Sequence, residues 1–459
     1  MIFTQYYLDC LSQASYLVGD ETTGQAVVID PRRDISDYLD DAQVHGLKIV
    51  GMINTHFHAD FLSGHLELAR ETGAWIGYGE AGQTGFASRA LADRERISLG
   101  DVTLEIMATP GHTPESISVL VFEHADDEVA FGVLTGDALF TGDVGRPDLL
   151  ASVGVSADEL GRMLYDSVQH KLMGLPDAVR VFPAHGAGSA CGKNLSTERQ
   201  STIGQQRAVN YACQPMTEEQ FLAVVTEGQP AAPAYFIYNA TLNKEDREIR
   251  DTDARIEPLD DERIAAARAE GAIVLDVRDA QEFAAGHLNN AISVPADGRM
   301  AETVGMVLSP DDRIIIMAPE GAEQETAVRL ARIGYDRVLG FIEHPEVHLV
   351  AHQESVSHAS RLTVAQAEAA LTETGVQVVD IRNAGELAQG QLPGARQLPL
   401  AELGRRIDEL DPTLPVLLYC AGGWRSSVAA STLRRAGFRD VSDLLGGYAA
   451  WVQAHAHAG

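Results

Sequence analysis

The chain has 459 residues, of which 45% are hydrophobic and 22% are charged, and its formal net charge is −31 at pH 7. This length predicts about three domains of ordinary size. Such an acidic chain argues against a nucleic-acid-binding protein or one that docks on an anionic membrane, because those partners carry negative charge themselves.

The amino-terminal residues and the cysteines indicate the compartment. The first seven residues lack the basic head and apolar core of a signal peptide, and no apolar run is long enough to span a bilayer. The four cysteines, Cys10, Cys191, Cys213 and Cys420, are too few and too scattered for a disulfide framework. We therefore expect a cytoplasmic protein with reduced thiols.

Residue types that bind metals follow four apolar segments in the first half of the chain. The run from Leu47 to Ile53 predicts a buried strand, and His56, His58 and Asp60 come just after it. Three later apolar segments are followed in turn by His112, Asp137 and His185. A single histidine of this kind is often structural, but four such strand ends in order predict a metal site.

These motifs resemble those of the metallo-β-lactamase superfamily: Thr-His-x-His-x-Asp, then Gly-His, then Gly-Asp, then a late His. The resemblance covers about the first 250 residues and predicts a domain over residues 1–250. It implies an αββα sandwich with the metal at one edge.

One position departs from the pattern of the hydrolases in that superfamily. They usually carry a histidine directly after the motif aspartate, and it helps to hold a second metal; here that position is Phe61. An apolar ring cannot ligate, and the spacing of the nearby His65 is wrong for the missing ligand. Two histidines and one carboxylate with open coordination positions suit non-haem Fe(II) and oxygen chemistry, whereas dinuclear zinc hydrolysis would require the lost ligand.

The persulfide dioxygenase branch of the superfamily fits this departure. The resemblance implies one Fe(II) ion per chain, held by His56, His112 and Asp137. It makes His58, Asp60 and His185 outer residues that orient the site or hydrogen-bond a ligand water. A zinc ion with His58 as a direct ligand is the alternative.

A second resemblance to that branch lies in the segment 141–148, whose glycines permit a tight loop. Arg146 is predicted to bind a carboxylate of a thiol substrate, with an ordinary surface ion pair as the alternative. Cys191 follows His185 closely, with Lys193 near enough to favour its thiolate. It is either a sulfur relay facing the metal pocket or a structural thiol.

The second half of the chain contains an internal repeat. A charged stretch from Asn243 to Pro258 predicts a linker. Beyond it, the segment that begins at Val274 matches the one that begins at Val378 with an offset of 104 residues, and the offset persists through two further matching pieces. Each repeat is too long for a solenoid unit, which predicts two tandem homologous domains, over residues 259–355 and 360–459.

Each repeat alternates apolar strands with helical stretches, which predicts α/β domains with parallel sheets. The runs Ile314–Met317 and Val416–Tyr419 predict buried strands, and helical patterns follow at Glu325–Ile333 and Ser426–Ala436. The signature Asp-x-Arg-x-x-x-Glu, with its Gly-x-Leu sequel, resembles rhodanese domains. The predicted fold class is thus an αββα sandwich followed by two tandem α/β rhodanese-like domains.

The last repeat carries the chemistry that a rhodanese requires. Cys420 ends a predicted strand, and a loop with two glycines and Arg425 leads into a helix. Backbone N–H groups at such a helix start, together with Arg425, stabilise first a thiolate and then a persulfide. We therefore predict that Cys420 is the nucleophile.

The middle repeat lacks this nucleophile. Ala318 stands where Cys420 stands, and Glu320 and Glu323 occupy a loop that is one residue shorter. Without a thiol, covalent sulfur transfer there is excluded. We expect an inactive rhodanese-like domain that acts as a spacer or docking unit.

Taken together, the chain resembles persulfide dioxygenase–rhodanese fusions of sulfide detoxification. This resemblance implies that a thiol persulfide (of glutathione, coenzyme A or a similar thiol) is oxidised by O2 to sulfite, and that Cys420 passes a second sulfur to sulfite to give thiosulfate. It also implies a homo-oligomer. The alternatives are a zinc hydrolase of the hydroxyacylglutathione type, which Phe61 disfavours, and a non-catalytic sulfur carrier or sensor.

Overall fold

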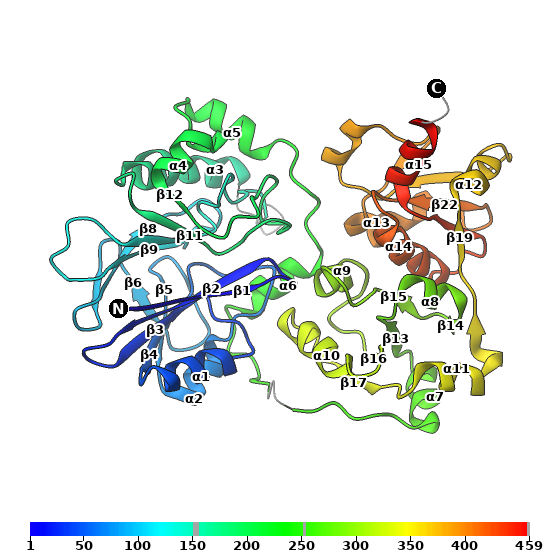
Figure 1. The fold of residues 1–459 in the computed structure, drawn as a ribbon, viewed down its shortest axis with the longest axis horizontal. Coiled ribbons are helices and arrows are strands. Elements are labelled where there is room, and N and C mark those ends of the chain that lie inside the picture. The colour runs from blue at the N-terminus through cyan, green and yellow to red at the C-terminus, as the bar shows by residue number, and fades with distance from the viewer. Residues whose placement is uncertain (150–155, 251–253, 457–459) are drawn as a thin grey trace. The chain divides into compact units, whose positions relative to one another are not determined.

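The computed structural model describes residues 1–149, 156–250 and 254–456. The chain divides into two compact units (Figure 1). The first comprises Met1–Ala232 and Phe236–Asp253, and the second comprises Pro233–Tyr235 and Ala254–Gly459. The second unit holds both repeats.

Two six-stranded sheets form the centre of the first unit. The first sheet has, in spatial order, β1 (Ile2–Leu8), β2 (Gln13–Asp20), β3 (Gln25–Ile29), β4 (Lys48–Ile53), β5 (Trp75–Gly79) and β6 (Arg89–Leu91). The second has β12 (Ser201–Thr202), β11 (Arg180–Pro183), β10 (Gly132–Gly136), β9 (Ile117–Phe122), β8 (Thr103–Ala108) and β7 (Arg96–Ser98). Both sheets are mixed: β3 to β6 run parallel, as do β10 and β11, while β7 to β10 are antiparallel.

Helices cover the outer face of each sheet, so the unit has four layers (Figure 1). These helices are α1 (Ser36–Val44), α2 (His65–Thr72), α3 (Ala157–Tyr165) with a π-helical continuation (Asp166–Lys171), α4 (Ile203–Val209) and α5 (Glu218–Thr226). A further helix, α6 (Tyr235–Leu242), begins with the last residue of the segment 233–235 that belongs to the second unit. One apolar cluster lies between the sheets, including Val27 and Val119. A second joins the first sheet to α1 and α2 through Tyr38 and Leu68, and a third joins the second sheet to α3 and α5. Burial of both faces of each sheet gives the predicted αββα sandwich.

The linker predicted from Asn243 to Pro258 begins later than the sequence indicated. Asn243 is buried, and its side-chain amide donates to the carbonyl oxygens of His58 and Phe61. Arg247 forms a bidentate ion pair with Glu67 at 2.7 and 2.8 Å. The charge-rich composition that suggested a linker reflects ion pairs with the first unit, at least as far as Arg247.

The second unit contains two parallel sheets, as the repeat predicted. The first repeat forms a four-stranded sheet of β15 (Ile292–Ser293), β13 (Ile273–Asp276), β16 (Ile314–Met317) and β17 (Val338–Phe341). The last repeat forms a five-stranded sheet of β19 (Ser360–Leu362), β23 (Val441–Leu444), β22 (Val416–Tyr419), β20 (Gln377–Asp380) and β21 (Arg396–Gln397). A short antiparallel pair, β14 (His287–Leu288) with β18 (Val356–Ser357), precedes the second sheet.

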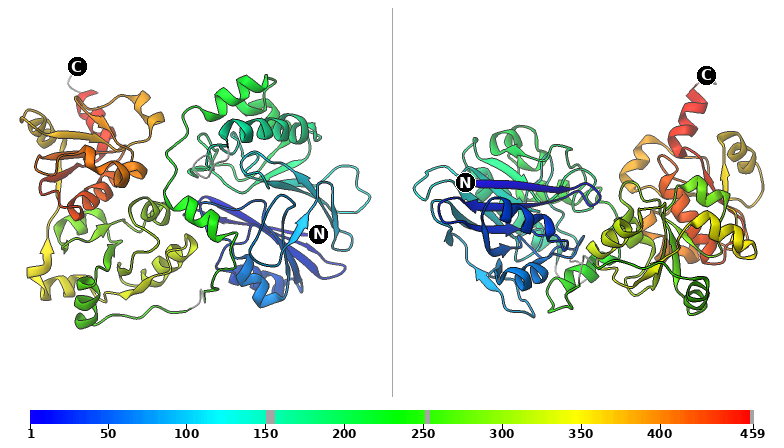
Figure 2. Two further views of the ribbon diagram at one scale, coloured as in Figure 1. Left: turned by 180° about the vertical axis from the view of Figure 1, so that it is seen from behind. Right: turned by 60° about the horizontal axis from the view of Figure 1, so that its bottom comes forward.

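Helices flank both sheets of the second unit (Figure 2). They are α7 (Asp261–Ala269), α8 (Ala280–Ala285), α9 (Met300–Val307), α10 (Glu323–Arg332), α11 (Pro345–Ala351), α12 (Val364–Leu371), α13 (Leu400–Arg406), α14 (Trp424–Arg435) and α15 (Gly447–Ala456). The two central strands coincide with the predicted runs, and α10 and α14 lie within two residues of the predicted helices. Among the helices of the described residues, none is both long and apolar enough to cross a membrane.

Candidate metal centre and candidate cysteine site

Three of the predicted ligands meet in one buried cluster, here called the metal pocket, at the ends of β4, β8 and β10. The Nε2 atoms of His56 and His112 lie 3.7 and 3.5 Å from Oδ2 of Asp137. All three side chains are about 1% exposed, and their ligand atoms lie within 4.8 Å of one another. This spacing is suited to a single metal ion.

Second hydrogen bonds fix which nitrogen of each imidazole faces the pocket. Nδ1 of His112 lies 2.9 Å from the carbonyl oxygen of Arg146, which can only accept, so Nδ1 carries the proton. Nδ1 of His56 lies 3.0 Å from the hydroxyl of Thr55, which itself donates to Asp30, so it too donates. In both rings Nε2 is therefore the nitrogen that faces Asp137 and is placed to bind a metal.

The carboxylate of Asp137 is the third group whose atoms face the position of the metal. Although burial opposes ionisation, His185 and His56 hold the pKa of Asp137 far below its ordinary value. Its Oδ2 atom is buried and has no hydrogen-bond partner among the described residues. Burial, followed by the neighbouring His58, keeps the pKa of His56 well below its ordinary value, so this imidazole stays neutral. Three converging lone pairs repel one another unless a cation lies between them.

The predicted outer residues surround this pocket without joining the three ligands. His185 bridges two carboxylates: its Nδ1 lies 2.7 Å from Asp137 Oδ1 and its Nε2 lies 2.7 Å from Asp60 Oδ2. Despite its burial, these carboxylates raise the pKa of His185 well above its ordinary value. Both ring nitrogens of His185 thus face carboxylate oxygens, which places His185 to orient Asp137.

His58 likewise has its Nε2 atom engaged by a carboxylate, that of Asp30, at 2.9 Å. Its ring lies 4.3 Å from that of Phe61, centroid to centroid, and Phe61 is 1% exposed. Sequence reasoning missed Asp30, which also accepts hydrogen bonds from the backbone and hydroxyl of Thr55. The one available signal was its place at the end of an apolar strand, two positions before the basic pair Arg32–Arg33.

Arg146 is buried and its guanidinium is already paired. Nε and Nη2 each donate to the carboxylate of Asp148 at 2.7 Å, and Nη1 donates to the carbonyl oxygen of Pro230 at 2.6 Å. Its backbone carbonyl fixes the His112 ring. The ion pair weighed as the alternative is therefore present, with Arg146 buried and Asp148 half-buried. Binding of a substrate carboxylate by Arg146 stays a prediction that requires the pair with Asp148 to open.

Cys191 lies beside the pocket, but its environment differs from the predicted one. It groups with Asp60 and His185. Burial and the nearby carboxylates of Asp137 and Asp60 raise the pKa of its thiol well above the ordinary value. The amine of Lys193 donates to the carbonyl oxygens of Val224 and Glu227. The expectation that Lys193 favours a thiolate at Cys191 is therefore wrong.

The second candidate site lies at the end of β22. Cys420 is 1% exposed, and its sulfur accepts a hydrogen bond from the backbone N–H of Gly423 at 3.1 Å. The hydroxyl of Ser426 lies 3.7 Å from the same sulfur. Gly423 adopts a φ of +90°, which a residue with a Cβ rarely takes. The loop thus points a backbone donor at the sulfur, as the sequence predicted.

Arg425 lies in the first turn of α14 and pairs with Glu386. Its Nη1 and Nη2 atoms donate to the two carboxylate oxygens at 2.8 and 2.6 Å. Although burial opposes it, Arg425 lowers the pKa of Glu386. The ion pair fixes the guanidinium at the start of the helix that follows the Cys420 loop.

The corresponding loop of the middle repeat has no thiol. Ala318 is buried at the end of β16, while Glu320 is exposed. Helix α10 begins at Glu323, so the loop 318–322 is one residue longer than the loop 420–423 before α14. The predicted shorter loop is therefore wrong: the residue is missing from the helix and not from the loop. Ala318 thus follows β16 as Cys420 follows β22, so the two residues occupy equivalent strand-end positions. At this position the middle domain has no nucleophile.

Comparison with known protein families matches this layout. Residues 8–185 match the model of the metallo-β-lactamase superfamily. Residues 260–343 and 363–454 each match that of the rhodanese-like domain.

Individual proteins are similar to the chain in part. A solved metallo-β-lactamase from Staphylococcus aureus is 32% identical with a TM-score of 0.67, over 74% of this chain and 98% of that chain. The human protein Persulfide dioxygenase ETHE1, mitochondrial, is 32% identical over 37% of this chain and 63% of its own length. The Schizosaccharomyces pombe protein Probable hydroxyacylglutathione hydrolase is 29% identical over 47% of this chain and 78% of its own length. The match thus spans less than two thirds of the human relative.

Proposed function

The chain belongs to the metallo-β-lactamase superfamily and carries two rhodanese-like domains after that domain, and on this basis we propose that it is a persulfide dioxygenase coupled to a sulfurtransferase. The substrate of the first step is the persulfide of a low-molecular-weight thiol, such as glutathione or coenzyme A. The product of the second step is thiosulfate. The role is detoxification of sulfide and persulfide.

The donor set of the metal pocket is the observation that carries the proposal. Nε2 of two histidines and Oδ2 of one aspartate face one point, and the buried Oδ2 of Asp137 has no hydrogen-bond partner among the described residues. Two histidines and one carboxylate, with positions left open, suit a single Fe(II) ion. Phe61 occupies the place of the ligand that a second metal would need, which disfavours dinuclear zinc hydrolysis.

The protein residues hold and orient the site. When bound, the ferrous ion supplies the activation of dioxygen that a closed-shell metal cannot. Thr55 and the Arg146 carbonyl keep the two imidazole rings in one tautomer. Nδ1 of His185 lies 2.7 Å from Oδ1 of Asp137, and this contact directs Oδ2 to the metal position.

The overall chemistry of the first step balances. One persulfide, one dioxygen and one water give the free thiol and sulfurous acid, which ionises to sulfite. The terminal sulfur loses four electrons and dioxygen gains them.

The second step belongs to Cys420. Its thiolate attacks the terminal sulfur of another persulfide, the S–S bond of the donor breaks, and the thiol leaves with its proton. Sulfite then attacks the outer sulfur on Cys420. The S–S bond of thiosulfate forms as the bond to Cys420 breaks, and the thiolate returns. The N–H of Gly423 stabilises the sulfur anion in both states.

The test compares two histidine variants of the full chain. His112→Asn should lose bound iron and oxygen uptake with glutathione persulfide together. The matched variant His65→Asn removes a buried histidine of the same unit that is not among the three ligands, and it should keep about one iron per chain.

Three results would overturn the proposal. Protein that contains zinc and hydrolyses S-lactoylglutathione would support the hydrolase alternative. Persulfide loading of Cys420 without oxygen uptake would support the sulfur carrier or sensor. Equal iron content in both variants would remove His112 from the ligand set.

A further inference from the structure

Helix α14, which begins directly after the Cys420 loop, lies along the inactive rhodanese-like domain (Figure 1, Figure 2). It packs against β15, the edge strand of that domain's sheet. Three hydrogen bonds follow the helix from its start to its end: Trp424 Nε1 to Asp297 Oδ1 at 2.8 Å, Ser293 N to Ser431 Oγ at 3.0 Å, and Arg435 Nη1 to the Asn290 carbonyl oxygen at 3.1 Å. The segment 290–297 of the inactive domain therefore contacts the whole length of this helix.

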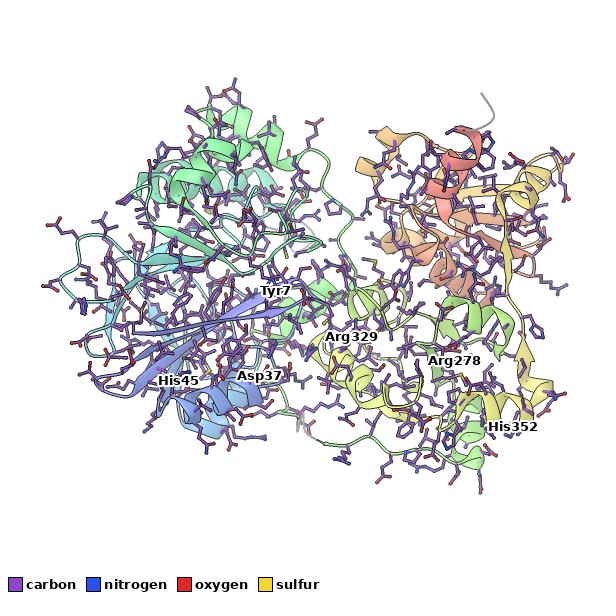
Figure 3. The ribbon with its side chains drawn as sticks, viewed as in Figure 1. Tyr7, Asp37, His45, Arg278, Arg329 and His352 are labelled. Atoms are coloured by element: carbon purple, nitrogen blue, oxygen red, sulfur yellow. The ribbon has the colours of Figure 1, made fainter. Side chains whose placement is uncertain are left out.

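The inactive domain also fixes the loop that carries Asp297. Arg329 lies on α10 and is labelled in Figure 3. It is 9% exposed, and its guanidinium donates to the carbonyl oxygens of Ala296 and, at 2.7 Å, Gly298. Both neighbours of Asp297 are thus held by one buried cation. The carboxylate of Asp297 meets Trp424 from a fixed backbone.

The contact between Asp297 and Trp424 lies one residue from the backbone donor to the sulfur. Trp424 directly follows Gly423, whose N–H donates to Cys420 Sγ. A Cβ added at Gly423 would lie 3.0 Å from the backbone nitrogen of Gly446. Gly423, whose backbone nitrogen carries this donor, is therefore confined by the Gly446 turn and is followed directly by Trp424, whose ring is anchored to Asp297.

We propose that the inactive rhodanese-like domain is a positioning element of the sulfur-transfer site, and that Asp297 acts through Trp424 to hold the Gly423 N–H on Cys420. The inference rests on the proposed sulfurtransferase step. It assigns a task to the domain that has no nucleophile. A donor held in advance stabilises a developing sulfur anion without reorganisation at the moment of transfer.

The expected effect is on turnover and not on donor affinity. The assay uses the full chain with a thiol persulfide and added sulfite, so that it does not depend on the metal site. Asp297→Ala and Trp424→Phe should each lower kcat for thiosulfate about five- to tenfold with unchanged KM for the persulfide. The double variant should be no slower than either single one, because both remove the same hydrogen bond.

Two further variants separate positioning from general docking. Asp297→Asn keeps an acceptor oxygen for Trp424 and should stay within about twofold of the wild-type kcat. Arg435→Ala removes a hydrogen bond at the far end of the same contact, and it should also leave kcat within about twofold. If Arg435→Ala slows transfer as much as Asp297→Ala, or if Asp297→Ala has no effect, the inference is wrong.

A readout that does not need the proposed activity completes the test. The rate of Cys420 alkylation by iodoacetamide at neutral pH, with Cys420→Ser as the blank, should fall in Asp297→Ala and recover in Asp297→Asn. An unchanged or faster alkylation in Asp297→Ala would contradict the positioning role. If the wild-type chain makes no thiosulfate, the proposed function fails, while the alkylation rates still decide the inference.

Discussion

In both rhodanese-like domains, a buried aspartate at the end of a central strand holds the arginine two residues later. Arg278 Nε and Arg382 Nε each donate to their aspartates, Asp276 and Asp380, at 2.9 Å. Each guanidinium also donates to the carbonyl oxygen of a glycine eight residues further along the chain, at 3.0 and 2.7 Å. The frame is therefore the same in the two domains.

The loops that follow the next strand differ. In the last domain, Gly423 turns its N–H to the sulfur of Cys420, and Arg425 is held by Glu386. In the middle domain the run from Ala318 to Glu323 has no thiol and no arginine, and its loop, 318–322, is one residue longer than the loop 420–423. The sheet and its buried ion pair therefore specify the fold, whereas the loop at the strand end specifies the chemistry. This separation permits one copy to lose activity and keep its structure.

The largest expected effect comes from removing the sulfur of the active loop. Cys420→Ser should lower thiosulfate formation by more than about 1,000-fold, because a hydroxyl does not form the persulfide intermediate. Oxygen uptake should persist, and sulfite should accumulate. Thiosulfate in the presence of this variant, with sulfite staying low, would place the transfer step elsewhere.

The reverse change tests whether a thiol alone is enough for sulfur transfer in the middle domain. Ala318→Cys in the Cys420→Ser background should keep transfer at least about 100-fold below the wild type. The loop of the middle domain spans 318–322, against 420–423 in the last domain, so its backbone donors are placed differently. Glu320 and Glu323 also disfavour an anion near the new sulfur. Substantial thiosulfate formation by this variant would mean that the loop differences described above are unimportant.

A smaller effect is expected from the ion pair that holds Arg425. Glu386→Gln should lower transfer about tenfold, because it removes the charge that fixes the guanidinium in the loop. The matched variant Glu409→Gln breaks an exposed pair with Arg406 in the same domain and should leave transfer unchanged. Equal rates for the two variants would show that Arg425 needs no such partner.

The smallest expected effect is a difference between the two rhodanese-like domains in how their free energy of unfolding depends on acid pH. Burial lowers the pKa of His287, in the middle domain, to about 4; its counterpart in the last domain is Gln391. Between the unfolded value near 6.5 and this folded value, the unfolded state binds more protons. The stability is therefore complete above about pH 6.5 and is lost as the pH falls to about 4, by up to about 3 kcal/mol.

Urea unfolding at several pH values checks this expectation. In His287→Gln the pH dependence over that window should be reduced for the transition of the middle domain. A variant with the same dependence as the wild type would show that other groups cause the acid sensitivity.

Much of this site could be predicted because its residues sit at strand ends. His56, His112 and Asp137 each follow an apolar run, and the ends of β4 in the first sheet and of β8 and β10 in the second meet at one edge of the sandwich. Phe61 and Ala318 were informative for a similar reason: each replaces a reactive residue at a position that a motif defines.

The features that the sequence did not reveal are side-chain pairs between distant segments. Asp30 contacts His58, Asn243 caps the same loop from far along the chain, and Asp297 meets Trp424 across a domain boundary. No periodicity or spacing marks such pairs, because folding alone brings them together. The ion pair that occupies Arg146 was weighed as an alternative, but its partner and its burial could not be read from the sequence.

The most direct test of the coupled activity is the amount of persulfide consumed for each dioxygen by the iron-loaded chain. The wild type should consume about two persulfides per dioxygen and release thiosulfate, whereas Cys420→Ser should consume about one and release sulfite. A wild-type chain that takes up no oxygen, or that consumes one persulfide per dioxygen without thiosulfate, would contradict the account.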